Sequence, residues 1–275
     1  MKQEATHRRR ETLRESSRFE PWEHVNRRIH VIGIGAGDPD YVTAQAVAAL
    51  NDTQVFFAMD KGDTKDDLVA LRRLICERFI REPGYRFHEM ADPPRARTAA
   101  DSPAYRQAVA NWHAERARLW AGAIESELGP GDVGAFLAWG DPSLYDSTLR
   151  ILDRVAEHVD IDYDVIPGIT AIQALTARHR IPLNDVGEPV LITTGRQLRE
   201  NGLSGSAVVM LDADCSFQSC PPGTRIWWGA YLGTPDELLF SGTVGEVGAR
   251  IAAARADARA EHGWIMDTYL LRSAD

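Results

Sequence analysis

The sequence predicts an α/β protein built from two domains. From Ile29 onward, short apolar runs alternate with longer amphipathic runs, which is typical of strands and helices in a largely parallel sheet. Beyond about residue 185, strand-like runs follow one another more closely, which indicates a mixed sheet. We therefore expect an N-terminal α/β domain over 29–184, a C-terminal α/β domain over 185–275 and a mobile tail over 1–28.

The first domain has five predicted strands and five predicted helices. The apolar runs place strands at 30–34, 54–58, 85–89, 133–138 and 161–166. Helical periodicity places helices at 43–50, 66–80, 103–128, 145–158 and 169–179. Helix 103–128 is the clearest, because Ser102 can cap it and Pro103 suits its first position.

The second domain is dominated by strands. They are predicted at 189–194, 207–212, 225–231, 238–242 and 264–271. A single Ala-rich helix is predicted over 244–259, between the last two strands. This order does not repeat the regular alternation of the first domain, so the two domains differ in topology.

Composition excludes several classes of protein. A net charge of −9 argues against a broad nucleic-acid surface. The sequence has neither the roughly 18 to 20 apolar residues in a row of a membrane span nor the apolar run of a secretory signal. Three cysteines are too few for a disulfide framework, and Cys215 and Cys220 lack nearby partners for a metal. We expect a cytoplasmic protein without a metal.

The first candidate loop follows the first strand and combines glycines with acids. Gly33, Gly35 and Gly37 alternate in the run IGIGAGDPDY, where Asp38 and Asp40 come next. A dinucleotide-binding loop leaves the following helix N-terminus free for a pyrophosphate. Here two acids already occupy that electropositive position. The loop therefore favours a nucleoside ligand that carries no phosphate.

Two further loops follow apolar strands in the same way. Gly140-Asp141-Pro142 repeats the end of the first loop, and Ile166–Ala171 joins the next strand to the next helix. A Gly-Asp-Pro sequence is also simply a good start for a helix, so each motif alone has a structural explanation. In a parallel sheet, however, these loops gather at one edge, where ligands bind.

Together the three loops resemble those of the tetrapyrrole methyltransferases, which transfer methyl groups from S-adenosylmethionine to intermediates of corrinoid and sirohaem synthesis. The first loop resembles the family's G-x-G-x-G-D-P segment, Ala138–Pro142 its second glycine-acid motif and Pro167–Ala171 its third. The likeness extends from Ile29 to Leu271. It implies the class III methyltransferase fold, in which a cleft lies between two α/β domains.

The resemblance also implies a cofactor site and an assembly. The family's S-adenosylmethionine contacts carry over to Ala36, Gly140, Asp141, Leu144, Thr170, Ala171, Met210 and Ala230. This cofactor has no phosphate, in agreement with the acids of the first loop. Members of the family are often dimers, so the resemblance implies a homodimer.

Further segments narrow the resemblance to one subfamily, which methylates ring carbon 1 of the anionic tetrapyrrole precorrin-5 and releases an acetyl group as acetate. These segments are 60–67, 92–97, Trp112-His113, Trp139 and 228–234. Release of acetate requires water or hydroxide at the acetyl carbonyl. We therefore expect a base or an orienting polar group in the cleft.

Five residues are candidates for contact with the substrate. Asp38 is the first candidate for the base, with helix capping as its alternative role. Tyr41 is a catalytic candidate as a hydrogen-bonding residue, with packing as its alternative role. Arg95 and Arg97 are predicted to bind substrate carboxylates, with a solvated basic loop as the alternative. Tyr145 is predicted to form a hydrogen bond with the substrate, with packing as the alternative.

Two other functions compete with the methyltransferase. An NAD-dependent oxidoreductase would use Asp60, which ends the second strand about where a ribose-binding acid belongs. Against it, the third glycine of G-x-G-x-x-G falls on Asp38 or Asp40, depending on where the count begins. A tetrapyrrole carrier without catalytic activity would not need all three cofactor loops.

Overall fold

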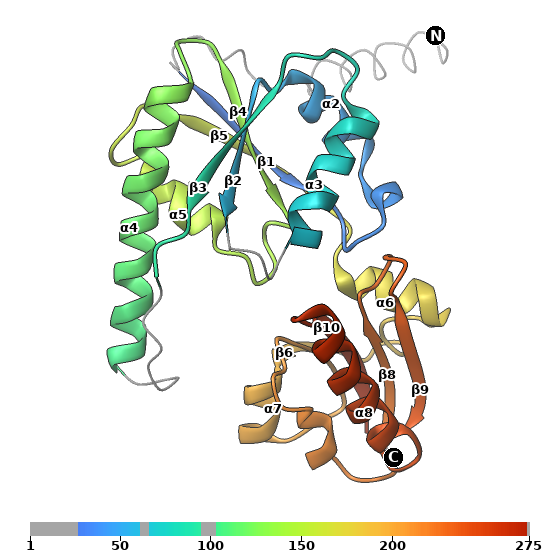
Figure 1. Ribbon diagram of the computed structural model, residues 1–275. Helices are drawn as coiled ribbons and strands as arrows, with labels where there is room; N and C mark the ends of the chain where they lie inside the picture. The colour runs from blue at the N-terminus through green and yellow to red at the C-terminus, as the bar shows by residue number, and fades with distance from the viewer. Residues whose placement is uncertain (1–26, 61–65, 95–102, 274–275) are drawn as a thin grey trace, which may run out of the picture.

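The computed structural model describes residues 27–60, 66–94 and 103–273. They form two β-sheets with helices packed on them, one sheet in the upper and one in the lower half of Figure 1. Most of the predicted tail, and the predicted substrate contacts Arg95 and Arg97, lie outside these residues. The division of the chain at residue 185 stays a prediction.

The first sheet is parallel throughout. Its strand order is β3-β2-β4-β1-β5. The strands are β1 (Arg28–Gly33), β2 (Val55–Asp60), β3 (Arg86–Ala91), β4 (Val133–Ala138) and β5 (Asp162–Ile166). The predicted strands all form. In this order β1 and β4 are central, so the loops that follow them leave the sheet side by side.

Helices cover both faces of this sheet. They are α2 (Ala44–Asp52), α3 (Asp66–Phe79), α4 (Pro103–Glu127) and α5 (Thr148–Val155), with a short 3-10 helix η1 (Pro39–Tyr41) in the first loop. One apolar cluster joins α4 and α5 to the sheet, where Trp120 stacks on Phe136 with ring centroids 4.2 Å apart. A second cluster joins α2 and α3 to the sheet. In Figure 1, α4 and α3 flank the sheet on opposite sides.

The second sheet is mixed, as predicted. Its order is β6-β7-β10-β8-β9, with only the β6–β7 pair parallel. The strands are β6 (Val190–Thr194), β7 (Ser206–Met210), β8 (Arg225–Ala230), β9 (Leu238–Thr243) and β10 (Asp267–Arg272). The predicted fold class is thereby confirmed.

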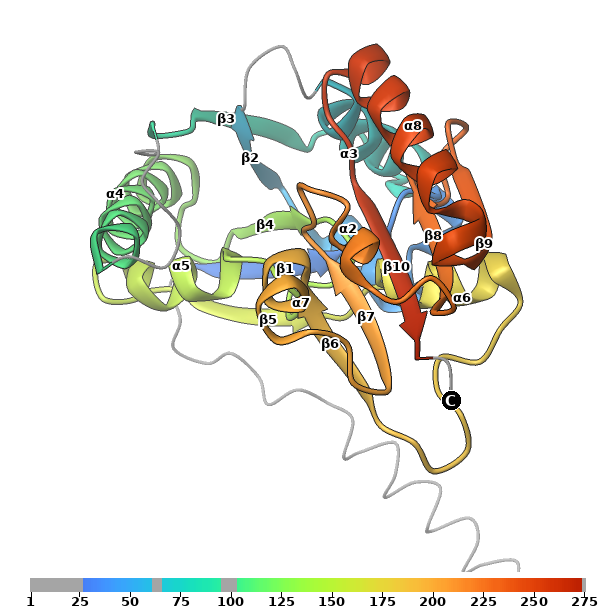
Figure 2. The ribbon, with the colours of Figure 1, turned by 90° about the horizontal axis from the view of Figure 1, so that it is seen from below.

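The helices of this half pack on opposite faces of its sheet. They are α6 (Ala171–His179), α7 (Gly195–Asn201) and α8 (Val244–His262), with a 3-10 helix η3 (Ser216–Ser219). The helix α6 belongs to one apolar cluster, whereas α8 and η3 belong to another. Figure 2 shows α6 and α8 on either side of β8 and β10. Among the described residues, no helix combines the length and apolarity needed to cross a membrane.

Two helices differ from the sequence prediction. The helix α7 was not predicted, and it begins where the Thr194 hydroxyl accepts a hydrogen bond from the Gln197 amide. The helix α5 was predicted from residue 145 but begins at Thr148. Tyr145 has a left-handed backbone with φ of 52°, and this turn delays the helix.

Three glycines bring the loops after β1, β4 and β5 together. A Cβ atom on Gly168 would lie 2.0 Å from the Gly140 carbonyl oxygen and 2.9 Å from the Gly33 backbone. A Cβ atom on Gly33 would lie 2.6 Å from the Gly168 nitrogen. Backbone therefore packs directly on backbone at this edge of the sheet, which only glycine allows.

The first loop also touches the second half of the molecule. A Cβ atom on Gly37 would lie 2.3 Å from the Leu232 carbonyl oxygen, and one on Gly233 would lie 2.7 Å from the Asp38 nitrogen. Each loop therefore has a glycine where the other approaches. This contact fixes the segment after β8 against the loop after β1.

The strand β1 carries a buried histidine between two carboxylates. His30 Nδ1 lies 2.5 Å from Asp164 Oδ1 on β5, and Nε2 lies 3.2 Å from Asp52 Oδ2 at the end of α2. Burial by itself would lower the pKa of His30, but hydrogen bonds and charge from Asp164 and Asp52 outweigh it and raise that pKa. A protonated His30 thus links β1, β5 and α2.

Replacing Gly168 by alanine should displace the loops. The new Cβ would overlap a backbone carbonyl, which cannot move aside as a side chain does. We therefore expect the free energy of unfolding to fall by about 1–3 kcal/mol. Gly122→Ala is the control, because a Cβ there meets nothing within 4 Å in α4 and should stabilise the helix by up to about 1 kcal/mol. Urea denaturation measures both, and equal stabilities of the two variants would contradict the packing argument.

His30 should make stability depend on pH. Because its pKa is raised in the folded state, its contribution is fully present below about pH 6.5 and is lost as pH rises through the folded-state pKa. We expect His30→Gln to be clearly less stable than the wild type at pH 6 and to differ less at pH 9. His158→Gln, at an exposed position, is the matched control. A stability difference that stays constant with pH would refute this assignment.

Candidate functional site

The three loops form a continuous backbone surface at the carboxyl edge of the first sheet. Gly35 and Gly140 exchange two backbone hydrogen bonds, of 3.2 and 2.8 Å, which join the first loop to the second. The Asp141 carboxylate accepts a hydrogen bond of 2.9 Å from the Gly168 amide, which joins the second loop to the third. The predicted convergence of the three loops is therefore present in the structure.

Asp141 also holds its own loop. Its Oδ1 accepts hydrogen bonds from the amide and the hydroxyl of Ser143, while Oδ2 accepts the bond from Gly168. Burial by itself would raise the pKa of Asp141, but these hydrogen bonds outweigh it and hold the pKa below the ordinary value. The charged Asp141 side chain thus links the second loop to the third by a hydrogen bond, in addition to capping its own loop.

Asp38 caps the short helix η1. Its Oδ1 accepts a 2.8 Å hydrogen bond from the Asp40 amide, which is the capping role weighed from the sequence. Asp38 also lines a cavity of about 630 Å³. Around it lie residues of the first loop and of α3, Trp139 after β4, Thr234 and Asp236 between β8 and β9, and Trp264 after α8. Capping and exposure to a cavity therefore coexist at this residue.

Tyr41 packs between glycines of the two halves. A Cβ on Gly35 would lie 2.6 Å from Tyr41 Cβ, and one on Gly233 would lie 3.0 Å from Tyr41 Cε2. Burial, and to a smaller extent the charge of Asp38, raises the pKa of Tyr41. The ring has a clear packing role, and the catalytic role of Tyr41 stays a prediction.

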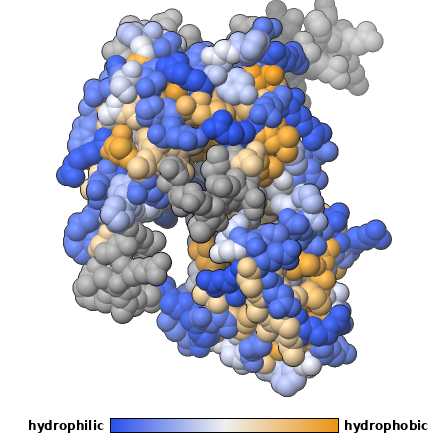
Figure 3. Space-filling model, viewed as in Figure 1, coloured by the Kyte–Doolittle hydropathy of each residue, from blue (hydrophilic) through white to orange (hydrophobic). Residues whose placement is uncertain are grey.

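Four of the predicted cofactor residues belong to one apolar cluster, in which α6 packs on the second sheet. Ala36 is buried there, with Leu144, Ala171 and Met210 packed at its margin. Ala230 lies fully buried in the neighbouring cluster, at the end of β8. The cluster unites the ends of β1 and β7 with the start of α6, so it connects the loops to both halves. Figure 3 shows apolar patches on both halves of the molecule.

Thr170 begins α6 through a capping box. Its hydroxyl accepts a hydrogen bond from the Ile172 amide and donates one to Gln173 Oε1. Gln173 Oε1 also accepts a hydrogen bond from the Thr170 amide. The hydroxyl thus has a structural role that sequence analysis did not predict. A ligand contact of Thr170 stays a prediction.

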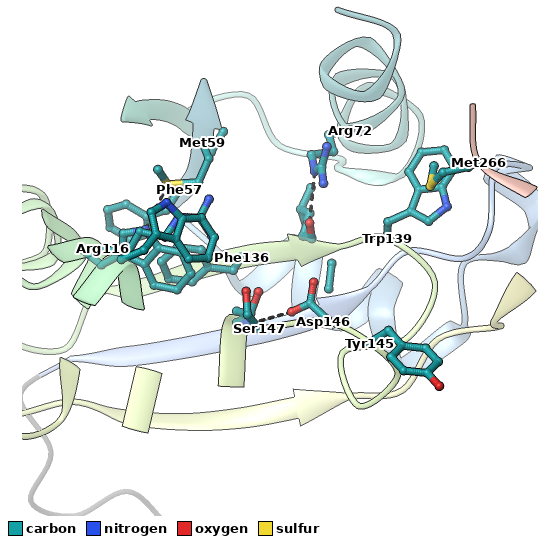
Figure 4. Close-up of a pocket in the computed structure, with 16 residues that line it drawn as sticks. Phe57, Met59, Arg72, Arg116, Phe136, Trp139, Tyr145, Asp146, Ser147 and Met266 are labelled. Carbon is teal, nitrogen blue, oxygen red and sulfur yellow. Dashed lines mark hydrogen bonds between the residues drawn. The ribbon is translucent and has the colours of Figure 1, made fainter. Parts of the chain in front are cut away.

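A second cavity, of about 340 Å³, has Trp139 in its lining as the first cavity does (Figure 4). Figure 4 shows Phe57, Met59, Arg116 and Phe136 gathered at one end, and Trp139, Tyr145 and Met266 at the other. Arg72 and Asp146 lie between these two groups. Tyr145, the predicted substrate contact, is therefore at the end of this cavity that adjoins the second loop.

Sequence analysis missed the charged groups of this cavity. Arg72 comes from α3 and donates through Nε to the Leu137 carbonyl, 3.1 Å away at the end of β4. Arg116 comes from α4, binds Asp92 through two hydrogen bonds of 2.8 and 2.9 Å, and stacks on Trp112. These residues are far apart in sequence, and only the strand order β3-β2-β4 brings them together.

The described residues give no indication of a metal site. They contain no group of three or more His, Cys, Asp or Glu side chains arranged to hold an ion. Cys76, Cys215 and Cys220 are free thiols, and burial raises the pKa of each one. For Cys76 that value is about 12, so this thiol is unreactive at neutral pH.

Comparison with known proteins identifies relatives over most of the chain. A Sinorhizobium protein named precorrin-6A synthase [deacetylating] is 51% identical over 90% of this chain and 95% of its own length. The crystal structure of a putative cobalamin synthesis related protein (CobF) from Corynebacterium diphtheriae has a TM-score of 0.79 at 44% identity, and the match covers 90% of this chain and 99% of that one.

A more distant structure shares the fold. Uroporphyrin-III C-methyltransferase from Thermus thermophilus, crystallised with S-adenosylhomocysteine, has a TM-score of 0.57 at 16% identity, covering 90% of this chain and 97% of that one. The model of the family Tetrapyrrole (Corrin/Porphyrin) Methylases matches residues 28–248, which include all three loops. The chain therefore belongs to the tetrapyrrole (corrin/porphyrin) methylase family.

Proposed function

We propose that this protein is a precorrin-6A synthase (deacetylating). It would use S-adenosylmethionine to methylate precorrin-5 at ring carbon 1, release acetate and form precorrin-6A in cobalamin biosynthesis. The observation that carries the proposal is the 51% identity to the Sinorhizobium protein of that name, which spans nearly the whole of both chains. The CobF structure from Corynebacterium diphtheriae supports it independently at the level of the fold.

The loops fit S-adenosylmethionine. Gly35, Gly37 and Gly140 have φ of 84°, 148° and 68°, a backbone region that favours glycine, and a Cβ atom on Gly140 would meet only Thr170 Cα within 4 Å, so the backbone at Gly140 is open to a ligand. Asp38 and Asp141 make this edge acidic, which suits a sulfonium and excludes a pyrophosphate. The proposed cofactor residues are those carried over from the family: Ala36, Gly140, Asp141, Leu144, Thr170, Ala171, Met210 and Ala230.

The protein's part in methyl transfer is positioning. When bound, S-adenosylmethionine supplies an electrophilic methyl group, so the chain needs no nucleophile of its own. The braced loops would hold the reacting groups in line, and the apolar cluster around Ala36 and Leu144 would keep water away. A rigid backbone cradle suits this task, because small misplacements reduce the rate strongly.

The proposed substrate contacts follow a charge argument. Arg95 and Arg97 would bind carboxylates of the anionic tetrapyrrole, with Tyr145 donating a hydrogen bond. The segment just before Arg95 is anchored beside the second cavity, because Asp92 pairs with Arg116 and the Pro93 carbonyl accepts from Trp112 Nε1 at 3.0 Å. Asp38 and Tyr41 complete the proposed site on the other side of the second loop.

A related methyltransferase is the second candidate. A Sinorhizobium precorrin-2 C(20)-methyltransferase is 28% identical over 55% of this chain, so methylation of another precorrin is the alternative function.

The proposal further includes a cytoplasmic location, a homodimer and the absence of a metal. Sedimentation of the purified protein would test the dimer, and metal analysis of the same sample would test the last point.

The proposed reaction can be tested directly. We expect the protein to convert precorrin-5 with labelled S-adenosylmethionine into a singly methylated product and to release one acetate per turnover. Mass spectrometry follows the methyl group, and an enzymatic acetate assay follows the second product. Methylation of precorrin-2 in preference to precorrin-5, or methylation without acetate, would contradict the assignment. In separate calorimetric titrations, binding of NADH together with no binding of S-adenosylhomocysteine would exclude methyltransferase activity.

Asp141→Ala should weaken cofactor binding. The change removes the acceptor for the Ser143 and Gly168 hydrogen bonds, which separates the second and third loops and costs about 1–3 kcal/mol of stability. We expect affinity for S-adenosylhomocysteine to fall at least tenfold by calorimetry. Asp132→Ala, which removes a 2.8 Å hydrogen bond from Gly129 at the far end of β4, is the control. Unchanged affinity with a lower melting temperature would show that Asp141 is only structural.

A further inference from the structure

The cavity beside the second loop has the size of a substrate arm. Its volume of about 340 Å³ is near the lower end of the roughly 300–1,000 Å³ of ligand pockets. It therefore accommodates one ring edge or side group and not a whole macrocycle. Its lining includes Trp139 and Tyr145, which flank Gly140 and Leu144 of the proposed cofactor site. A group that enters here lies beside the proposed cofactor site.

The cavity is divided by polarity. Phe57, Trp120 and Phe136 make an aromatic end, with ring centroids of the stacked pairs 4.2 and 5.3 Å apart. The guanidinium at this end, Arg116, is paired with Asp92 and lies over the ring of Trp112. Arg72 and Asp146 lie in the middle, as Figure 4 shows, and Ser147 and Thr148 also line the cavity. An acetyl group is divided in the same way: its methyl group is apolar and suits the aromatic end, and its carbonyl group is polar and suits the charged middle of the cavity.

Only one of the two carboxylate oxygens of Asp146 accepts a hydrogen bond from the residues that the structure describes. Its Oδ1 accepts a 2.6 Å hydrogen bond from the Thr148 amide at the start of α5. Its Oδ2 accepts no hydrogen bond from any residue that the structure describes. The preceding residue, Tyr145, keeps a left-handed backbone, a costly conformation that is common at functional sites. The carboxylate is therefore fixed while one oxygen stays available in the cavity.

Arg72 supplies positive charge at the same place. Its Nε bond to the Leu137 carbonyl fixes the guanidinium at the end of β4. Burial lowers the pKa of Arg72, and the charge of Asp146 opposes that effect, so the two groups interact across the cavity. Poorly solvated charge stabilises an oxyanion more strongly than charge in water.

The cavity around Asp38 is less suited to the same chemistry. It holds a second acid, Asp236, and among the described residues that line it His262 is the basic side chain, with no lysine or arginine. A water attacking a carbonyl there would generate negative charge beside two carboxylates. That arrangement destabilises an oxyanion.

We propose that this cavity binds the acetyl group, with Asp146 as the catalytic base and Arg72 as the charge that stabilises the oxyanion. The proposal rests on the function proposed above. Asp146 takes a proton from water, and the hydroxide oxygen bonds to the acetyl carbonyl carbon. The bond from that carbon to the ring carbon then breaks, and its electron pair stays on the ring carbon, where it forms the new bond to the methyl group that S-adenosylmethionine supplies. Asp146 releases its proton to bulk water. Acetic acid leaves and ionises to acetate.

The decisive experiment compares Asp146→Asn with Asp132→Asn and Asp38→Asn. In each variant, the amide oxygen can still accept the backbone hydrogen bond that the aspartate accepts, so folding should be preserved. Acetate release and methyl incorporation are measured separately with precorrin-5. We expect Asp146→Asn to lose acetate release about 100-fold or more, while S-adenosylhomocysteine affinity and quenching of tryptophan fluorescence by precorrin-5 stay within about twofold of the wild type. Asp132→Asn should keep acetate release at the wild-type level.

Arg72 requires two variants, because the methionine variant could fail to fold without the bond to Leu137. We expect Arg72→Met to reduce acetate release at least tenfold and Arg72→Lys, which keeps the charge, to reduce it much less. Wild-type acetate release by Asp146→Asn, or its loss in Asp38→Asn alone, would overturn the inference but not the proposed function. No acetate release by the wild-type protein would overturn both.

Discussion

The site depends on the direct contact of three stretches of backbone. Gly33, Gly140 and Gly168 approach so closely that a single methyl group on Gly168 would lie 2.0 Å from a carbonyl oxygen. At this distance no side chain can stand between the loops, so their shape is set by backbone hydrogen bonds and by the strand order of the sheet. The surface that results is rigid, polar and lined by peptide groups. Such a surface suits a ligand that must be held in one orientation.

The same contact places the second half of the molecule. The third loop continues directly into α6, which packs on β8 and β10 of the second sheet. From the other direction, Gly233 after β8 returns to touch the first loop at Asp38. The second sheet is therefore attached to the loops from both ends. A change in the loops would move the apolar cluster around Ala36 and Met210 as well.

Local sequence patterns predicted the fold well and the charged groups poorly. Every strand was found because apolar periodicity is a local property, and the loop motifs were found because glycine and aspartate have definite roles at turns. Arg72 and Asp146 were missed because they are separated by β3 and α4 and meet only through the order of the parallel strands. The hydrogen bond from the Gly168 amide to Asp141 was missed for the same reason. The local sequence around a capping aspartate does not show whether the side chain also accepts a hydrogen bond from a distant loop.

Three aspartates illustrate why a cap does not decide function. Asp38, Asp141 and Asp146 each accept a hydrogen bond from the amide two residues ahead, a local contact that any of them would make in a structural role. What differs is the surroundings of the other oxygen. In Asp141 it accepts an amide from another loop, in Asp38 it belongs to an acidic cavity, and in Asp146 it belongs to a cavity that contains a guanidinium. Because a base that generates an oxyanion needs positive charge nearby, the neighbours of an acid carry more information about its chemistry than its cap does.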